Sequence, residues 1–280
     1  MLYYCQIYLT SIKVGEFMIG AIIGDIVGSV YEFKNVKSKR FKWFAKGCRI
    51  TDDTVLTVAV ADALLDIAAA NDEASFKELL IDKFHYHARN HLLCGFGARF
   101  LSWVSKQQRT PYNSFGNGSA MRVSPAAYAA STLEEALYLA KLCAEITHDH
   151  PEGIKGAQCT AGAIFLAKIG YSKEDIRSFA EKYYDLSFTL DEIRPVYKYE
   201  ISCQGSVPQA IVAFLEAKNF KDAISNAISI GGDSDTIAAI TGSVAGAYYP
   251  ISEKLRKKAF SYLDFEATDI ILRFEEKFIK

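Results

Sequence analysis

The stretch VLTVAVADALLDIAAA (55–70) decides the fold class of this chain. Its apolar residues follow the i, i+3, i+4 spacing of one helical face. Val60, Ala63 and Ile67 make the opposite face apolar as well. A helix that is apolar nearly all round has to be covered by other elements on every side. The stretch therefore predicts a central helix around which the rest of the protein packs.

The chain on both sides of this stretch is mostly helical in its spacing. Ser131-Thr132 before two glutamates and Ser172 before Lys-Glu-Asp are typical helix starts. Residues 196–202 alternate as a short strand does, but no strand–helix alternation recurs, which argues against a Rossmann-type fold. Helices are expected over residues 76–88, 133–145, 153–169, 208–218, 220–230, 234–248 and 252–260. The sequence predicts an all-α fold, a single compact domain of many helices.

Met18 directly precedes the first informative motif, so we expect residues 1–17 to be an N-terminal extension and residues 18–280 to form the domain. No stretch reaches about 18 uninterrupted apolar residues, so we expect no membrane span. The first 17 residues have neither a basic region nor a small-residue cleavage site, which argues against a signal peptide.

Composition excludes some classes of protein. Of the 280 residues 50% are hydrophobic, which excludes a disordered chain. The formal net charge is −1, so no basic excess is available for sequence-specific nucleic-acid binding. Six cysteines are scattered without a CxxC pair, and a chain of this length needs no disulfide framework. We expect free thiols and a cytoplasmic location.

Two acidic clusters stand at helix starts: TDDT (51–54) and GGDSDT (231–236). Helix capping explains one such cluster, but two that both open buried helices indicate a cation, because buried like charges repel. Carboxylate and hydroxyl oxygens suit Mg²⁺, Mn²⁺ or Ca²⁺. Two divalent ions would neutralise the four carboxylates of Asp52, Asp53, Asp233 and Asp235.

Three other motifs allow more than one interpretation. FGNGSAMR (115–122) could bring backbone N–H groups to an anion, or be an ordinary turn before Pro125. THDHP (147–151) could hold a transition metal, or be the polar end of a helix. Glu32 follows an apolar helix and carries no signal by itself. The histidines His85, His87 and His91 do not share one helical face, so we interpret them as surface residues.

Taken together, the motifs resemble the ADP-ribosylglycohydrolase family. The matching stretches occur in the family's order and span about residues 18–250: GAIIGDIVGSVYE (20–32), TDDT (51–54), PYNSFGNGSAMRVSP (111–125), THDHPEGIKGAQ (147–158), CQGSVPQA (203–210) and SIGGDSDTIAAITG (229–242). The resemblance implies an all-α enzyme that binds two Mg²⁺ or Mn²⁺ ions. It also implies hydrolysis of the N- or O-glycosidic bond between ADP-ribose and an acceptor.

The resemblance also implies roles for individual residues. The metal ligands would be Thr51, Asp52, Asp53, Asp233, Asp235 and Thr236. Glu32 would transfer the proton, a role that Asp53 or Asp233 could exchange with it. The substrate would be held by Gly116, Asn117, Gly118, Ser119, Ala120 and Met121 near the diphosphate and distal ribose, and by His148 near the nucleotide. Asp25 matches a motif position without a clear role.

The expected substrate is an ADP-ribosylated compound, in which the acceptor is a protein side chain such as arginine or serine, or a small molecule. Two alternatives stay open. One is a magnesium-dependent hydrolase of another nucleotide or ribosyl metabolite. The other is a non-catalytic ADP-ribose-binding module. Neither the acceptor nor the oligomeric state follows from the sequence.

Overall fold

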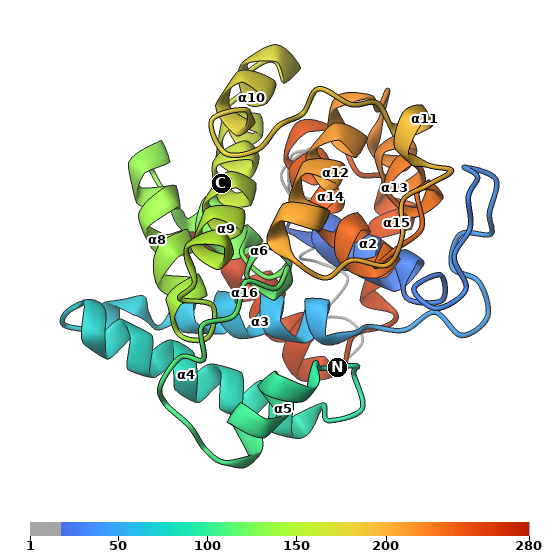
Figure 1. Ribbon diagram of the computed structural model, residues 1–280. Coiled ribbons are helices and arrows are strands. Elements are labelled where there is room, and N and C mark those ends of the chain that lie inside the picture. The colour runs from blue at the N-terminus through green and yellow to red at the C-terminus, as the bar shows by residue number, and fades with distance from the viewer. Residues whose placement is uncertain (1–17, 280) are drawn as a thin grey trace.

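A computed structural model describes residues 18–279, so the expected extension over residues 1–17 lies outside the described residues. Between residues 18 and 279 the regular structure is helical, with no strand, and the prediction of an all-α fold is confirmed. Figure 1 shows the helices packed into one body, with α3 crossing its middle. In this part of the chain no helix combines the length and the apolar character that crossing a bilayer requires.

The helices follow one another along the whole described chain. They are α2 (Ile19–Gly28), α3 (Asp52–Leu65), the 3-10 helix η2 (Ile67–Ala69), α4 (Glu73–Asn90), α5 (Ala98–Ser105), α6 (Gly118–Met121), α7 (Ser124–Ala129), α8 (Leu133–Glu145), α9 (Pro151–Lys168), α10 (Lys173–Ala180), α11 (Leu190–Ile193), α12 (Cys203–Leu215), α13 (Phe220–Ser229), α14 (Ser234–Tyr248), α15 (Glu253–Phe260) and α16 (Phe265–Phe278). Each predicted helix is present. Three start earlier than predicted, because Asp72 caps α4, His150 caps α9 and Ser202 caps α12.

The prediction of a central helix is confirmed in α3. Every residue from Asp53 to Leu64 is buried. Helices α2, α4, α7, α14 and α16 all pack against α3. Because its first turn is mostly buried as well, Asp53 faces the interior of the protein, whereas Asp52 is only partly buried.

Helices α2 and α14 pack with their backbones in contact. Gly20, Gly24 and Gly28 lie four residues apart on the face of α2 that meets α14. A Cβ atom on Gly24 would clash with the carbonyl oxygen of Ala238, and one on Gly28 would clash with the backbone of Asp235. Glycine lets two helices approach this closely. The approach brings the carboxylate of Asp235, at the start of α14, beside the C-terminal half of α2.

The strand expected over residues 196–202 is not formed. Ser202 makes a single isolated bridge to Gly116, Val196 ends the turn after α11, and residues 197–201 have no regular structure. The main-chain N–H of Asn117 donates to the carbonyl of Ile201 at 2.8 Å. The segment is therefore a strap between α11 and α12 rather than a strand of a sheet.

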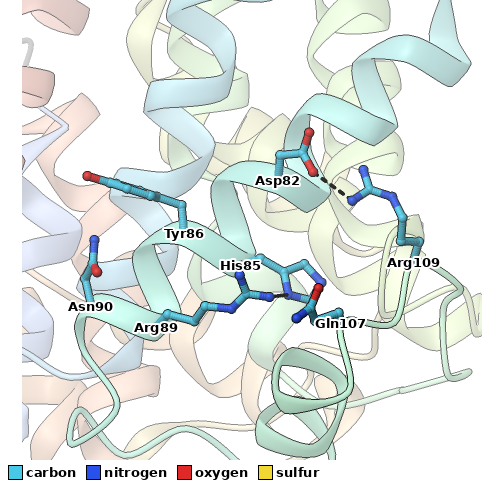
Figure 2. A pocket seen from close by; sticks show the side chains of 7 residues that line it. All are labelled: Asp82, His85, Tyr86, Arg89, Asn90, Gln107 and Arg109. Atoms are coloured by element: carbon cyan, nitrogen blue, oxygen red, sulfur yellow. Dashed lines mark hydrogen bonds and ion pairs between the residues drawn. The ribbon is translucent and has the colours of Figure 1, made fainter.

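The interpretation of His85 and His87 as surface residues is wrong, because both side chains are buried. His87 Nε2 pairs with Asp62 at 3.0 Å. His85 stacks on Trp103, with ring centroids 4.2 Å apart. Its Nε2 lies 2.9 Å from the carbonyl oxygen of Gln108. His85 is one of the residues that line a surface hollow of about 360 Å³. Figure 2 shows Arg89 reaching toward the imidazole of His85. The i, i+2 spacing did not reveal that loop residues cover this side of α4.

Candidate functional site

The first acidic cluster is built around Asp25 of α2, which is fully buried. Its carboxylate accepts hydrogen bonds from the main-chain N–H groups of Thr51 (2.9 Å) and Thr54 (3.2 Å). It also accepts from both threonine hydroxyls. Burial raises the pKa of Asp25, and these hydrogen bonds counteract part of the rise. Asp25, whose role the sequence left open, thus helps to cap α3 and fixes the position of its first turn.

The second acidic cluster is held by a tight turn. Gly231 and Gly232 both have left-handed backbone, with φ of 70° and 76°, a conformation that favours glycine. The turn places Asp233 at the N-cap of α14 and Asp235 in its first turn. Asn117 donates its side-chain N–H to Asp233 at 2.7 Å, which ties the glycine loop to this cluster.

The fold joins the two clusters into one site. Asp25, Asp53 and Asp235 form one group of three carboxylates, and Glu32, Asp233 and Asp235 form another. Within each group the nearest oxygens lie within 4.8 Å of one another. Asp235 belongs to both groups. Among the described residues, no other acidic, histidine or cysteine side chains form such a group.

Two of the buried carboxylates in this site lack hydrogen-bond donors for one of their oxygens. Oδ1 of Asp53 and Oδ1 of Asp235 are buried without a hydrogen-bond partner in the described part of the chain. The other oxygen of Asp53 accepts from the hydroxyls of Thr51 (3.3 Å) and Thr236 (3.2 Å). Burial and then the neighbouring carboxylates raise the pKa of Asp53 and Asp235 well above the usual range. Buried, unsatisfied, like-charged oxygens are what a hard divalent cation would satisfy.

Asp52 occupies a different place from Asp53. It lies outside both three-carboxylate groups and is only partly buried on the wall of the adjoining cavity. Burial, followed by the charges of Asp25 and Asp233, raises the pKa of Asp52 to about 8. Asp52 therefore shares the electrostatic environment of the clusters and faces open space.

Glu32 lies in the loop after α2 and is half-buried. Burial and then the charge of Asp233 raise its pKa, while a hydrogen bond from the Tyr199 hydroxyl and the charge of Arg49 lower it. Asn35 fixes the main chain of this loop: its side chain donates to the carbonyl of Gly232 at 2.9 Å and accepts from the Gly232 N–H at 2.8 Å. Glu32 is thus tied directly to the turn that carries Asp233.

A cavity of about 400 Å³ opens above the carboxylates. It collects most of the residues that the sequence predicted for the site: Glu32, Thr51, Asp52, Asp53, Gly116, Asn117, Gly118, Met121, His148, Asp233, Asp235 and Thr236. Ser119 and Ala120 do not line it. The Ser119 hydroxyl donates to the Gly153 carbonyl at 2.7 Å, and Ala120 is fully buried.

The glycine loop is shaped by close packing against His148. A Cβ atom on Gly118 would lie 3.2 Å from His148 Nε2. Four main-chain N–H groups, of Gly116, Asn117, Ala120 and Met121, are bonded within the protein, so they are not free for an anion. Burial and then the charges of Arg122 and Arg99 hold the pKa of His148 well below its usual range. Its imidazole is therefore neutral at neutral pH.

The THDHP motif joins the end of α8 to the start of α9: the N–H groups of Thr147 and His148 bond to the carbonyl of Ala144, and Pro151 is the first residue of α9. This fits the interpretation as a polar helix end, and no histidine belongs to a group of metal-ligating side chains in residues 18–279. His150 caps α9 by accepting from the Glu152 N–H at 3.1 Å. Thr147 accepts a hydrogen bond from the buried Arg122 at 2.7 Å.

Other cavity residues were missed by the sequence analysis. They include Phe33, Arg49, Arg99, Tyr112, Arg122 and Tyr199. Burial lowers the pKa of Arg122 to about 10, and its Nε and Nη1 have no partner in the described chain. Tyr112 and Arg122 lie inside or beside the quoted glycine stretch, which was the only signal for them. Tyr199 was hidden in the segment predicted as a strand.

The chain is similar to known proteins over most of its length. The family model for ADP-ribosylglycohydrolase matches residues 12–273. ADP-ribosylhydrolase ARH3 of Homo sapiens is 27% identical over 90% of this chain and 89% of its own length. ADP-ribosylarginine hydrolase Tri1 of Pseudomonas putida (strain GB-1) is 25% identical over 84% of this chain and 70% of its own.

The fold has a solved counterpart. A chain of an ADP-ribosylglycohydrolase-related protein complex superposes with a TM-score of 0.66 at 21% identity, covering 92% of this chain and 95% of that one. The similarity of the fold and the match of the family model along nearly the whole chain lead to one conclusion. The chain belongs to the ADP-ribosylglycohydrolase family.

Proposed function

We propose that this protein hydrolyses the glycosidic bond that joins ADP-ribose to an acceptor, using two divalent cations, Mg²⁺ or Mn²⁺. The observation that carries the proposal is the pair of carboxylate groups that share Asp235 on the floor of a cavity of about 400 Å³. Human ARH3 and Tri1 are named as hydrolases of ADP-ribosylated compounds, which supports the same reaction here.

The donors present fit two hard cations. Asp25, Asp53 and Asp235 would hold one ion, and Glu32, Asp233 and Asp235 surround the place for the other. The hydroxyls of Thr51 and Thr236, which bond to Asp53, and the carboxylate of Asp52 on the cavity wall would complete the ligand set. When bound, such ions supply positive charge and Lewis-acid polarisation next to the reacting sugar.

Glu32 is the residue proposed to move the proton. Its carboxyl is half-buried at the cavity wall, and burial followed by the charge of Asp233 raises its pKa, the direction that suits a carboxyl that transfers a proton. The anomeric carbon of a ribosyl group gains positive charge as the acceptor leaves, so the surrounding carboxylates would stabilise it. Asp53 and Asp233 remain candidates for the same role.

The remaining residues would bind and orient the nucleotide. Gly116, Gly118 and Met121 line the cavity together with the neutral imidazole of His148. Asn117 contributes indirectly, since its amide holds Asp233. Ser119 and Ala120 support the loop from behind and are not proposed to touch the substrate.

The test is release of ADP-ribose from peptides carrying ADP-ribosylated arginine or serine, with Mg²⁺, with Mn²⁺ and with EDTA. Release that EDTA abolishes and Mg²⁺ or Mn²⁺ restores supports the proposal, and the preferred peptide identifies the acceptor. Binding of ADP-ribose without turnover would identify a binding module. Turnover only of other nucleotides or ribosyl metabolites would identify a different hydrolase.

A further inference from the structure

The hydroxyl of Tyr199 donates a hydrogen bond to Oε1 of Glu32 at 3.0 Å. The Tyr199 ring also stacks on Phe33, the residue after Glu32, with centroids 6.1 Å apart and planes 26° from parallel. All three side chains line the cavity. We propose that Tyr199 is a positioning residue that holds the Glu32 carboxyl in its productive orientation, an inference that rests on the proposed function.

Glu32 needs such a partner because its surroundings repel it. The nearest acidic groups, Asp233 and Asp235, approach its carboxylate to within 4.8 Å. Asn35 anchors only the main chain of the loop, so it leaves the side-chain torsions of Glu32 free. Among residues 18–279, the Glu32 carboxyl accepts a hydrogen bond from one donor, the hydroxyl of Tyr199. Without it, the carboxyl would turn away from the acidic floor toward solvent.

Tyr199 can serve this purpose because its own backbone is fixed on both sides. Two residues before it, the carbonyl of Tyr197 accepts from Lys37 Nζ at 2.6 Å. Two residues after it, the carbonyl of Ile201 accepts from the Asn117 N–H at 2.8 Å. The strap that carries Tyr199 is thus tied to the Glu32 loop and to the glycine loop at once.

The geometry also leaves Glu32 able to react. A single hydrogen bond at Oε1 leaves Oε2 free to exchange a proton with substrate or water. The ring of Phe33 packs against one face of the Tyr199 ring, which opposes a swing of the side chain toward Phe33. Orienting a catalytic group in this way acts mainly on kcat, since binding of the nucleotide elsewhere in the cavity is unchanged.

Tyr199→Phe tests the inference, because it removes the hydroxyl and keeps the ring stacked on Phe33. With the peptide substrate that the wild type cleaves best, we expect kcat to fall about 10- to 100-fold, the usual range for residues that orient a reactive group. The KM value should stay within about twofold, because ground-state binding is not altered. Circular dichroism and the melting temperature should match the wild type.

A double-mutant cycle with Glu32→Gln separates positioning from a general structural role. If Tyr199 acts through the Glu32 carboxyl, Tyr199→Phe should lower kcat no further in the Glu32→Gln background, because contacting residues are not additive. Tyr86→Phe is the matched control. Tyr86 also donates to a glutamate, Glu266 Oε1 at 2.8 Å, and is 49% exposed against 50% for Tyr199. It lies by the hollow of Figure 2, so its replacement should leave kcat unchanged.

Crystal structures supply a readout that does not depend on turnover. We expect one Glu32 rotamer in the wild type and a displaced or divided Glu32 side chain in Tyr199→Phe. An unmoved Glu32 carboxyl, or a kcat loss that is equal with and without Glu32, overturns the inference. A wild type that releases no ADP-ribose overturns the proposed function instead, and the crystallographic comparison still decides whether Tyr199 positions Glu32.

Discussion

Two parts of this molecule bury carboxylates in opposite ways. Glu275 of α16 is buried against Arg256 of α15, whose guanidinium donates to its carboxylate at 2.9 Å. Asp53 and Asp235 are equally buried, yet each has one oxygen without a partner in the described chain. The protein can satisfy a buried carboxylate, and it does so at α15–α16 but not where α3 meets α14.

The difference separates structural charge from functional charge. Burying an ionised group is costly unless another group compensates for it. At Glu275 the compensating cation belongs to the chain. At Asp53 and Asp235 the neighbours are further acids, which raise the pKa values rather than lower them. The proposed function explains this cost in stability, since the cations proposed for the site would bring the positive charge that the ion pair already has.

Asp235→Asn gives the largest expected effect, because Asp235 belongs to both carboxylate groups. We expect ADP-ribose release to become undetectable. In EDTA the free energy of unfolding should rise by about 1 kcal/mol, since one repelling charge is removed. Activity assays and urea denaturation measure the two effects. An active variant, or one that unfolds more easily than the wild type in EDTA, would make Asp235 a structural residue like Glu275.

Glu275→Gln should have the opposite pattern. Removing one member of a buried ion pair costs about 3–5 kcal/mol of stability. Activity per folded molecule should be unchanged. Urea denaturation and kcat measured below the unfolding transition check both statements. Glu253→Gln is the control, because its pair with Lys257 on the same helix α15 is exposed and should contribute little. If Glu275→Gln loses as little stability as Glu253→Gln, the buried Arg256–Glu275 ion pair does not stabilise the fold.

Metal titration of the wild type tests whether the carboxylate site, unlike the Arg256–Glu275 ion pair, is stabilised by a cation. After EDTA treatment and dialysis, Mg²⁺ or Mn²⁺ at 100 times its Kd should stabilise the protein by about 2.7 kcal/mol. Thermal unfolding at increasing metal concentration measures the shift. Asp235→Asn should lose the shift and Glu275→Gln should keep it. Equal shifts in the two variants would place the cation somewhere other than between α3 and α14.

Deletion of residues 1–17 should have the smallest effect. The carboxylate site and the Arg256–Glu275 ion pair both lie in residues 18–279. We therefore expect unchanged activity and an unchanged melting temperature. Differential scanning calorimetry and the peptide assay of the truncated chain provide the check. The family model starts at residue 12, so loss of activity on deletion would show that the domain begins before Met18.

The helical fold was predictable because its strongest signals are local. The cap at Thr132 and the apolar spacing of the next turns set α8 at Leu133–Glu145, as predicted. Helix α16 was not predicted, although Asp264 caps it by accepting from the Ala267 N–H at 2.8 Å. Its buried residues Ala267, Ile270, Ile271 and Phe274 follow the i, i+3, i+4 spacing, so the sequence carried a helical signal here that was overlooked. The segment 196–202 was misjudged because an alternating pattern cannot show whether a partner strand exists.

The site could be predicted only in part from sequence. Clusters such as Asp52–Asp53 and Asp233–Asp235 can be found in the sequence because their members are adjacent or nearly adjacent along the chain. The sharing of Asp235 between two groups depends on how closely α2 approaches α14, and the spacing of Gly20, Gly24 and Gly28 does not show which helix they will meet. Tyr199 was missed for the same reason, since it is 167 residues from Glu32 and meets it only through the strap.

The glycine contact between α2 and α14 has a further consequence. Most helix pairs meet through side chains that change rotamer and let the helices shift, whereas here Gly24 meets the Ala238 carbonyl directly. The spacing between Asp25 and Asp235 is then set by rigid peptide groups. A site with fixed spacing selects cations by ionic radius, because Ca²⁺ needs oxygens at about 2.3–2.6 Å and Mg²⁺ at about 2.0–2.1 Å. If the proposed cations bind here, three glycines on one helix would thus help the site to discriminate between Mg²⁺ and Ca²⁺.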